Sequence, residues 1–230
     1  MLTSTTSTSS KVISLPFAWL AIATSVAVIA LLAGLHILSS EFDPAWRMVS
    51  EYANGQYGWV LSLMFFFWGL SSWALAYALW SQAQTTAGKV GLAFLVAAGI
   101  GEAMASVFDV NHSLHGLSAL IGIPSLSIAA MLISVSLSRT QAWSRVKKSL
   151  LWTANLTWIS VVLLIVSFIV MIVTYTQSGG DMNTTEVPTS LPEGVIALVG
   201  WANRFLIVVY CIWVMTVAWQ AIKVYGQKPS

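Results

Sequence analysis

The sequence predicts an all-α, polytopic integral membrane protein whose six transmembrane helices form one bundle. Hydrophobic residues make up 57% of the 230 residues, charged residues make up only 8%, and the mean hydropathy is +0.81. A soluble domain carries about 25% charged residues, so this chain has too few charges to cover its surface in water. The apolar residues also gather in stretches that are long enough to cross a bilayer.

The predicted membrane domain covers 17–222, between an N-terminal tail over 1–16 and a C-terminal tail over 223–230. A spanning helix needs about 20 mostly apolar residues. The six spans that meet this requirement are 17–38, 58–80, 90–108, 116–137, 149–175 and 194–222. The first span is too long for the apolar part of a signal peptide, so we expect a retained anchor. Ser190 and Glu193 have the spacing of a capping box and are predicted to begin the last span.

Lysine and arginine are distributed unevenly between the two sides of the predicted bundle. Eight of them fall in the two tails, in the loop between the second and third spans and in the loop between the fourth and fifth spans. They are Lys11, Lys89, Arg139, Arg145, Lys147, Lys148, Lys223 and Lys228. The three opposite loops contain only Arg47. Cytoplasmic loops carry the excess of basic residues, so both termini are predicted to be cytoplasmic. The opposite, outer side holds all three histidines and most acidic residues, namely Glu41, Asp43, Glu51, Asp109, Asp181, Glu186 and Glu193.

The first outer loop contains DPAWRMVSEYANG (43–55), which has the signals of a short helix. Asp43 suits the N-cap, Pro44 suits the first helical position, and Gly55 can end the helix. Two interpretations remain open. The segment is either an amphipathic helix that lies in the membrane interface or an ordinary structured connector.

Two ionisable residues lie inside predicted spans, Glu102 in the third and Arg204 in the sixth. Glu102, Ser106 and Asp109 share one helical face, which is predicted to point into the bundle. Charges at this depth are costly unless they are paired or hydrated, so we expect a Glu102–Arg204 pair. The pair either fixes helix packing or belongs to a proton or substrate site in a water-filled cavity.

The stretch FDVNHSLHGLS (108–118) combines Asp109, His112 and His115, and His36 lies on the same side of the membrane. Neutral imidazoles plus a carboxylate form the usual ligand set of a catalytic zinc with one open position, so His36, His112 and His115 are candidate metal ligands and zinc is the candidate cofactor. Alternatively, histidine and aspartate can act as a general base without metal. The third interpretation is an interfacial cluster in which His115 caps a helix and His112 faces water.

Four motifs occur in order along the chain: VSEYANGQYGW (49–59), VFDVN (107–111), HGLSAL (115–120) and GWANRFL (200–206). In these motifs the chain resembles an uncharacterised family of bacterial and archaeal six-helix membrane proteins, domain of unknown function family 998. The resemblance implies a location in a prokaryotic inner membrane and brings no established activity. The family's serine–acid pair, aspartate and histidine correspond here to Ser50, Glu51, Asp109 and His115, which are therefore the candidate catalytic residues.

The composition also limits the class of function. The net charge is only +2, and no basic run with interleaved aromatic residues is present, so nucleic acid is not an expected partner. Membrane lipids are expected partners, and a protein partner remains open. Three functions stay open: a non-catalytic subunit that binds lipid or protein, a metal-dependent hydrolase or transferase acting on a lipid-linked group at the outer leaflet, and a proton-coupled transporter of small solutes. A looser likeness to the membrane hydrolases that include alkaline ceramidases suggests the second.

Overall fold

The computed structural model describes residues 14–181 and 190–225, and these residues form helices and the segments between them, with no strand. The elements are α1 (Leu15–Leu38), η1 (Val49–Asn54), α2 (Gly58–Leu79), α3 (Thr86–Val107), α4 (His115–Ser138), η2 (Gln141–Val146), α5 (Lys147–Gln177) and α6 (Val199–Tyr225). The segments η1 and η2 are 3-10 helices. Lys11, Glu186 and Lys228 lie outside the described residues.

Six helices in the described part of the chain are long and apolar enough to cross a membrane, which confirms the predicted fold class. Most of their ends lie within a few residues of the predicted ones. The start of the last helix was predicted wrongly, because α6 begins at Val199 and not at 194. Gly194 has a φ of +91°, a left-handed backbone that a right-handed helix cannot contain, so Ser190 and Glu193 do not cap this helix.

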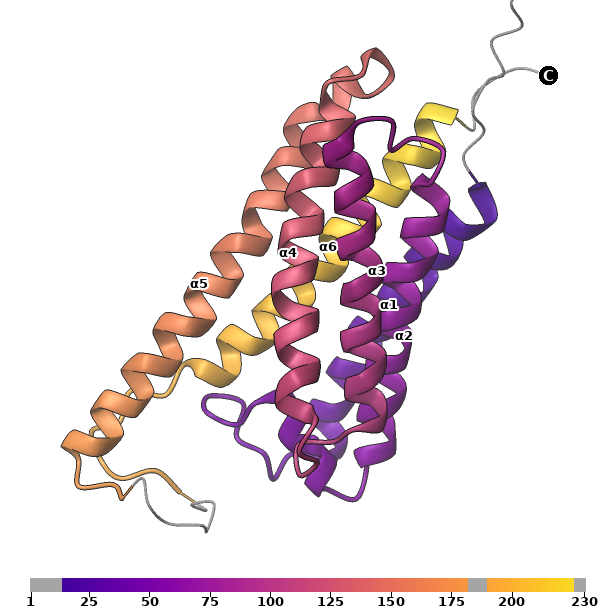
Figure 1. Ribbon diagram of the computed structural model, residues 1–230. Helices are drawn as coiled ribbons and strands as arrows, with labels where there is room; N and C mark the ends of the chain where they lie inside the picture. The colour runs from indigo at the N-terminus through magenta and orange to yellow at the C-terminus, as the bar shows by residue number, and fades with distance from the viewer. Residues whose placement is uncertain (1–13, 182–189, 226–230) are drawn as a thin grey trace, which may run out of the picture.

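The helices pack as a closed ring in chain order, in which each helix contacts the next and α6 returns to contact α1. Both ends of the described chain lie at the same end of the bundle, as Figure 1 shows. The backbones of α3 and α4 approach closely at Gly101 and Gly122. A Cβ on Gly101 would lie 2.7 Å from the Ser118 carbonyl oxygen, so only glycine allows this contact.

Helix α5 belongs to the ring along only part of its length. Its buried residues all lie between Leu150 and Leu164, and no residue from Ile165 to Gln177 is buried. Figure 1 shows this second half diverging from α4. The part of α4 beside this second half of α5 is therefore not covered by α5, whereas the rest of α4 is.

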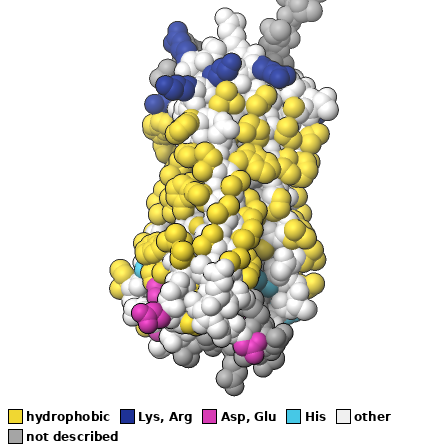
Figure 2. All heavy atoms as spheres, turned by 90° about the vertical axis from the view of Figure 1, so that its left-hand side faces the viewer, with side chains coloured by type: hydrophobic (Ala, Val, Ile, Leu, Met, Phe, Trp, Pro, Cys, Tyr) yellow, Lys and Arg dark blue, Asp and Glu magenta, His cyan; other side chains and the backbone are white. Residues whose placement is uncertain are grey.

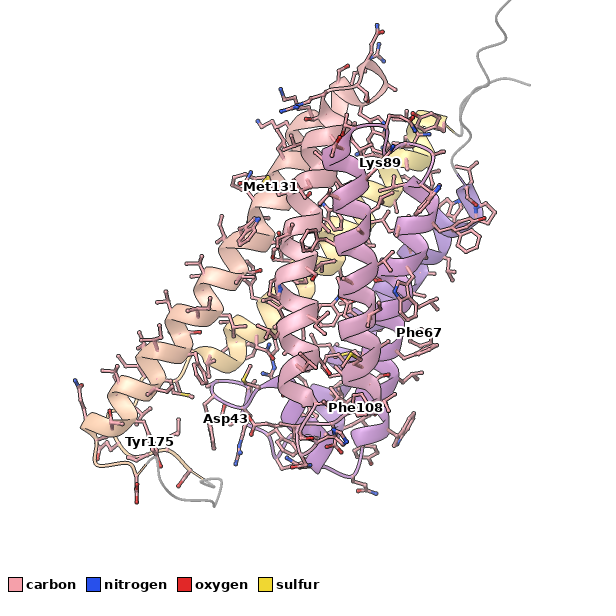
Figure 3. The ribbon with its side chains drawn as sticks, viewed as in Figure 1. Asp43, Phe67, Lys89, Phe108, Met131 and Tyr175 are labelled. Atoms are coloured by element: carbon pink, nitrogen blue, oxygen red, sulfur yellow. The ribbon has the colours of Figure 1, made fainter. Side chains whose placement is uncertain are left out.

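Charged side chains separate to the two ends of the bundle, with an apolar band between them (Figure 2). We call the end that carries Lys89, Arg139 and Arg145 the basic end, and the end that carries Asp43, Glu51 and Asp109 the acidic end. Figure 3 shows Lys89 at the basic end, with Asp43 and Phe108 at the other. Such a band between two polar ends is the surface expected of a protein that spans a bilayer.

Candidate functional site

The segment from Asp43 to Gly55 crosses the acidic end and differs in part from its prediction. Only Val49–Asn54 is helical, as the 3-10 helix η1, and Gly55 ends it as predicted. The Asp43 Oδ1 accepts a hydrogen bond from the Ala45 amide at 2.9 Å, so Asp43 caps a turn and not the helix. The segment is thus a structured connector that holds η1 over the bundle.

Arg204 joins this connector to the bundle. Its side chain is only 4% exposed, and its guanidinium donates four hydrogen bonds. Nε donates to His36 Nε2 at 3.0 Å and Nη2 to the Tyr52 hydroxyl at 2.9 Å. Nη1 donates to the carbonyl oxygens of Arg47 at 2.7 Å and Gly200 at 2.9 Å. One buried cation therefore ties α6 to α1 and to η1.

Two further contacts fix the start of α6 against the same connector. The Val49 amide donates to Asn203 Oδ1 at 2.9 Å, and the Gly200 amide donates to the Ala45 carbonyl oxygen at 3.0 Å. Gly200 is pressed against the backbone, because a Cβ there would lie 2.6 Å from the Arg47 carbonyl oxygen. The motifs 49–59 and 200–206, which lie far apart in sequence, meet at these contacts.

Glu102 is buried, with 5% of its surface exposed, and it faces α2. The Ser72 hydroxyl donates to Glu102 Oε2 at 2.7 Å. The other carboxyl oxygen, Oε1, is buried and has no hydrogen-bond partner among the described residues. An unsatisfied buried oxygen costs about 1–3 kcal/mol, so this atom is suited to accept a donor from a bound molecule.

The predicted pair of Glu102 with Arg204 is wrong. Among the described residues the structure forms an ion pair between Arg47 and Glu51, at 2.7 Å, and none at Glu102. Helical side chains lean toward the N-terminus of their own helix. Helix α3 begins at the basic end and α6 begins at the acidic end, so the Glu102 and Arg204 side chains lean in opposite directions.

A cavity of about 90 Å³ lies beside Glu102, between α2, α3, α4 and α6 and under η1. It has room for several water molecules. Its lining is mainly apolar, and Glu102 is its only charged side chain among the described residues. The side chains of the lining that carry a polar atom are Ser50, Trp68, Glu102, His115, Ser118, Asn203 and Tyr210, and the buried Trp68 Nε1 has no hydrogen-bond partner among the described residues.

The cavity has no lining residue from α5 among the described residues, although α5 lies between α4 and α6 in the ring. His115, Ala119 and Ile123 form a stripe on α4 that lines the cavity and is partly exposed. Deeper in the bundle α4 and α6 are joined, because the Tyr210 hydroxyl donates to the Ile123 carbonyl oxygen at 2.8 Å. The α4 wall of the cavity is therefore partly exposed on the side where α5 diverges.

The three histidines do not form a shared metal site. No group of three potential metal ligands exists among the described residues. A histidine binds metal through a ring lone pair, and the lone pair on His36 Nε2 already accepts from Arg204. The His112 Nδ1 likewise accepts from the Leu114 amide at 3.1 Å, on an exposed loop. The residues present therefore do not fit the zinc ion that the sequence suggested.

His115 is the histidine that faces the cavity. Its Nδ1 lies 2.9 Å from the Phe108 carbonyl oxygen, which can only accept, so Nδ1 carries the proton. In the neutral ring Nε2 is then a hydrogen-bond acceptor. Asp109 is not brought to this place, because α3 ends at Val107 and the exposed Asp109 accepts from the Asn111 amide.

The other candidate catalytic residues are also separated. Ser50 lines the cavity, whereas Glu51 is used within η1. Glu51 Oε1 accepts from the Met48 amide at 2.8 Å and its Oε2 pairs with Arg47. The structure thus brings Ser50 and His115 to the cavity and leaves Asp109 and Glu51 outside it.

Ser72, Tyr52 and Tyr210 are site residues that no sequence motif singles out as functional. Ser72 lies within an apolar span, where a hydroxyl has few partners. Its position there indicates a polar contact with another helix and could have marked it as a candidate. Tyr52 lies in the motif 49–59, but its contact with Arg204 depends on the fold of the connector.

The four motifs quoted from the sequence all converge on the acidic end. The motif 107–111 joins them through Asn111, whose Nδ2 donates to Asn54 Oδ1 of η1 at 2.8 Å. The motif 115–120 supplies the α4 wall of the cavity through His115, Ser118 and Ala119. No curated protein and no solved structure matches the chain. A family model described as "Protein of unknown function (DUF998)" matches residues 21–220, and the chain therefore belongs to this family.

Proposed function

We propose that this protein is a non-catalytic membrane protein that binds a lipid or a similar amphiphile in the cavity beside Glu102. The observation that carries the proposal is the partly exposed α4 wall of this cavity, which α5 does not line, and from it we infer a sideways opening between α4 and α6. Glu102 lies five residues before the end of α3 at Val107, which places it about 8 Å inside the helix end. A molecule in the bilayer can therefore reach the cavity without crossing water.

The lining of the cavity supports a ligand with both apolar and polar parts. Side chains such as Phe65, Leu206 and Ile207 offer apolar contact, and a few polar groups lie among them. Binding sites for small molecules commonly combine an apolar lining with a small number of polar groups that fix orientation. An acyl or alkyl chain would extend from the opening along the exposed face of α4, over Leu117 and Leu120.

We also propose that both termini are cytoplasmic and that the cavity opens toward the outer leaflet. Support comes from the basic loops, which lie together at the basic end, because lysine and arginine are enriched on the cytoplasmic side. A prokaryotic cytoplasmic membrane is the location that fits the resemblance to the family's bacterial and archaeal members.

The experiment is native mass spectrometry of the protein in detergent with added phospholipid. Ala119 lines the cavity, so Ala119→Phe is expected to fill it and to remove most of the bound lipid. Ala93→Phe is the matched control, because Ala93 is exposed on α3 and does not line the cavity. Equal lipid retention by wild type and both variants would refute the proposal.

A further inference from the structure

We propose that the cavity recognises the primary ammonium headgroup of an amphiphile, with Glu102 Oε1 as the group that receives it. This inference rests on the proposed function, since it assigns the chemistry of the ligand that the cavity takes. The observation behind it is the buried Oε1 atom, which has no partner among the described residues and belongs to a side chain that lines the cavity.

The first step concerns the hydrogen bonds that the ligand must make. Ser72 donates to Oε2 and leaves Oε1 as an acceptor. His115 can contribute a second acceptor, because its Nδ1 proton faces the Phe108 carbonyl oxygen, and Nε2 of an imidazole protonated at Nδ1 alone carries a lone pair. Trp68 Nε1 is one unsatisfied donor in the same lining, but the acceptors lie on two different helices and favour a ligand with more than one N–H or O–H donor.

The second step concerns charge. No lysine or arginine lines the cavity among the described residues, and Arg204 donates four hydrogen bonds to α1, α6 and the connector. A carboxylate at this buried position is stable only beside a partner of opposite sign, which none of the described residues supplies. A primary ammonium supplies three donors and a positive charge, whereas a hydroxyl supplies one donor and no charge.

The third step concerns size and direction. A cavity of about 90 Å³ has room for several waters, which matches a headgroup of a few heavy atoms better than a whole lipid. The opening between α4 and α6 leaves the chain of the amphiphile in the bilayer. The headgroup would thus point inward to Glu102, and the alkyl chain would point outward past Ala119.

The experiment compares three probes with the same alkyl chain by native mass spectrometry: dodecylamine, dodecanol and dodecyltrimethylammonium. The amine has donors and charge, the alcohol has a donor alone, and the trimethylammonium has charge alone. We expect wild type to bind the amine about tenfold more tightly than the trimethylammonium, because a charge-assisted hydrogen bond contributes this much affinity. We expect the alcohol to lie between the two.

Glu102→Gln keeps the size of the side chain and is expected to abolish the preference for the amine. Asp109→Asn is the matched control, because it makes the same change at an exposed residue outside the cavity. Equal binding of the three probes, a preference for the alcohol, or a preference that survives Glu102→Gln would overturn the inference. If wild type still binds the probes in those cases and Ala119→Phe removes that binding, the proposed function stands and only the preference for an ammonium is wrong. If wild type binds no probe and no phospholipid, both the proposed function and this inference are wrong. Dodecylamine preference that is lost in Glu102→Gln and kept in Asp109→Asn is the supporting result.

Discussion

The Nε of Arg204 donates a hydrogen bond to Nε2 of His36 at 3.0 Å, and this bond joins α6 to α1 at the acidic end. The same guanidinium holds Tyr52 and the Arg47 carbonyl oxygen, so it also fixes the connector above the cavity. His36 thus accepts a hydrogen bond from Arg204 and does not bind a metal. Replacing His36 is therefore expected to lower stability more than replacing His112.

His36→Ala is expected to destabilise the protein by about 1–3 kcal/mol, because it leaves a buried, charged N–H donor without its acceptor. His112→Ala is the control, since His112 is exposed and a surface change costs within about 0.5 kcal/mol. The measurement is the free energy of unfolding in mixed micelles. An equal loss of unfolding free energy in the two variants, together with loss of a bound transition metal, would instead support a metal site formed by the three histidines.

The sequence was sufficient for the helices but not for their contacts. Long apolar stretches determine where a chain crosses a bilayer, so the six spans and the glycine that ends η1 were predictable. The partner of Glu102 was not, because the choice between Arg204 and Ser72 depends on the direction in which each helix runs. The metal prediction failed for a related reason: residue types show which atoms can bind a metal, but not which lone pairs are already occupied.

The sequence predicted the end of the bundle at which the candidate site lies better than it predicted which residues form the site. Polar motifs at one end of the bundle indicated the acidic end, and His115 and Ser50 do line its cavity. Asp109 left the predicted helical face because α3 ends two residues before it, and helix ends are hard to place from sequence. The cavity itself depends on the divergence of α5, which no local pattern encodes.

Gly200→Ala is expected to destabilise the protein by about 1–3 kcal/mol. A Cβ at this position would press on the carbonyl oxygens of Pro44 and Arg47, and backbone atoms cannot move away as a flexible side chain can. Gly34→Ala is the matched control, because a Cβ on Gly34 meets nothing within 4 Å. Thermal unfolding of both variants checks the prediction, and an unchanged midpoint for Gly200→Ala would show that the connector does not lie against α6.

Tyr210→Phe is expected to loosen the contact of α4 with α6 at the inner limit of the cavity. The hydroxyl donates to the Ile123 carbonyl oxygen and shares a 2.7 Å hydrogen bond with the Ser127 hydroxyl. Its removal is expected to cost about 1–2 kcal/mol of unfolding free energy. Tyr77→Phe serves as the control, since Tyr77 is exposed on the apolar surface. The same small change in both variants would contradict the assigned role of Tyr210.

The orientation of the bundle can be tested with two single cysteines. Ser113 lies on the exposed loop at the acidic end and Ser144 is exposed at the basic end, whereas the native Cys211 is buried and gives little background. In intact cells a membrane-impermeant maleimide is expected to label Ser113→Cys, because basic loops stay in the cytoplasm and leave the acidic end outside. Ser144→Cys is expected to react only after the membrane is permeabilised. The opposite pattern would place both termini outside and would make the cavity beside Glu102 accessible from the inner leaflet instead.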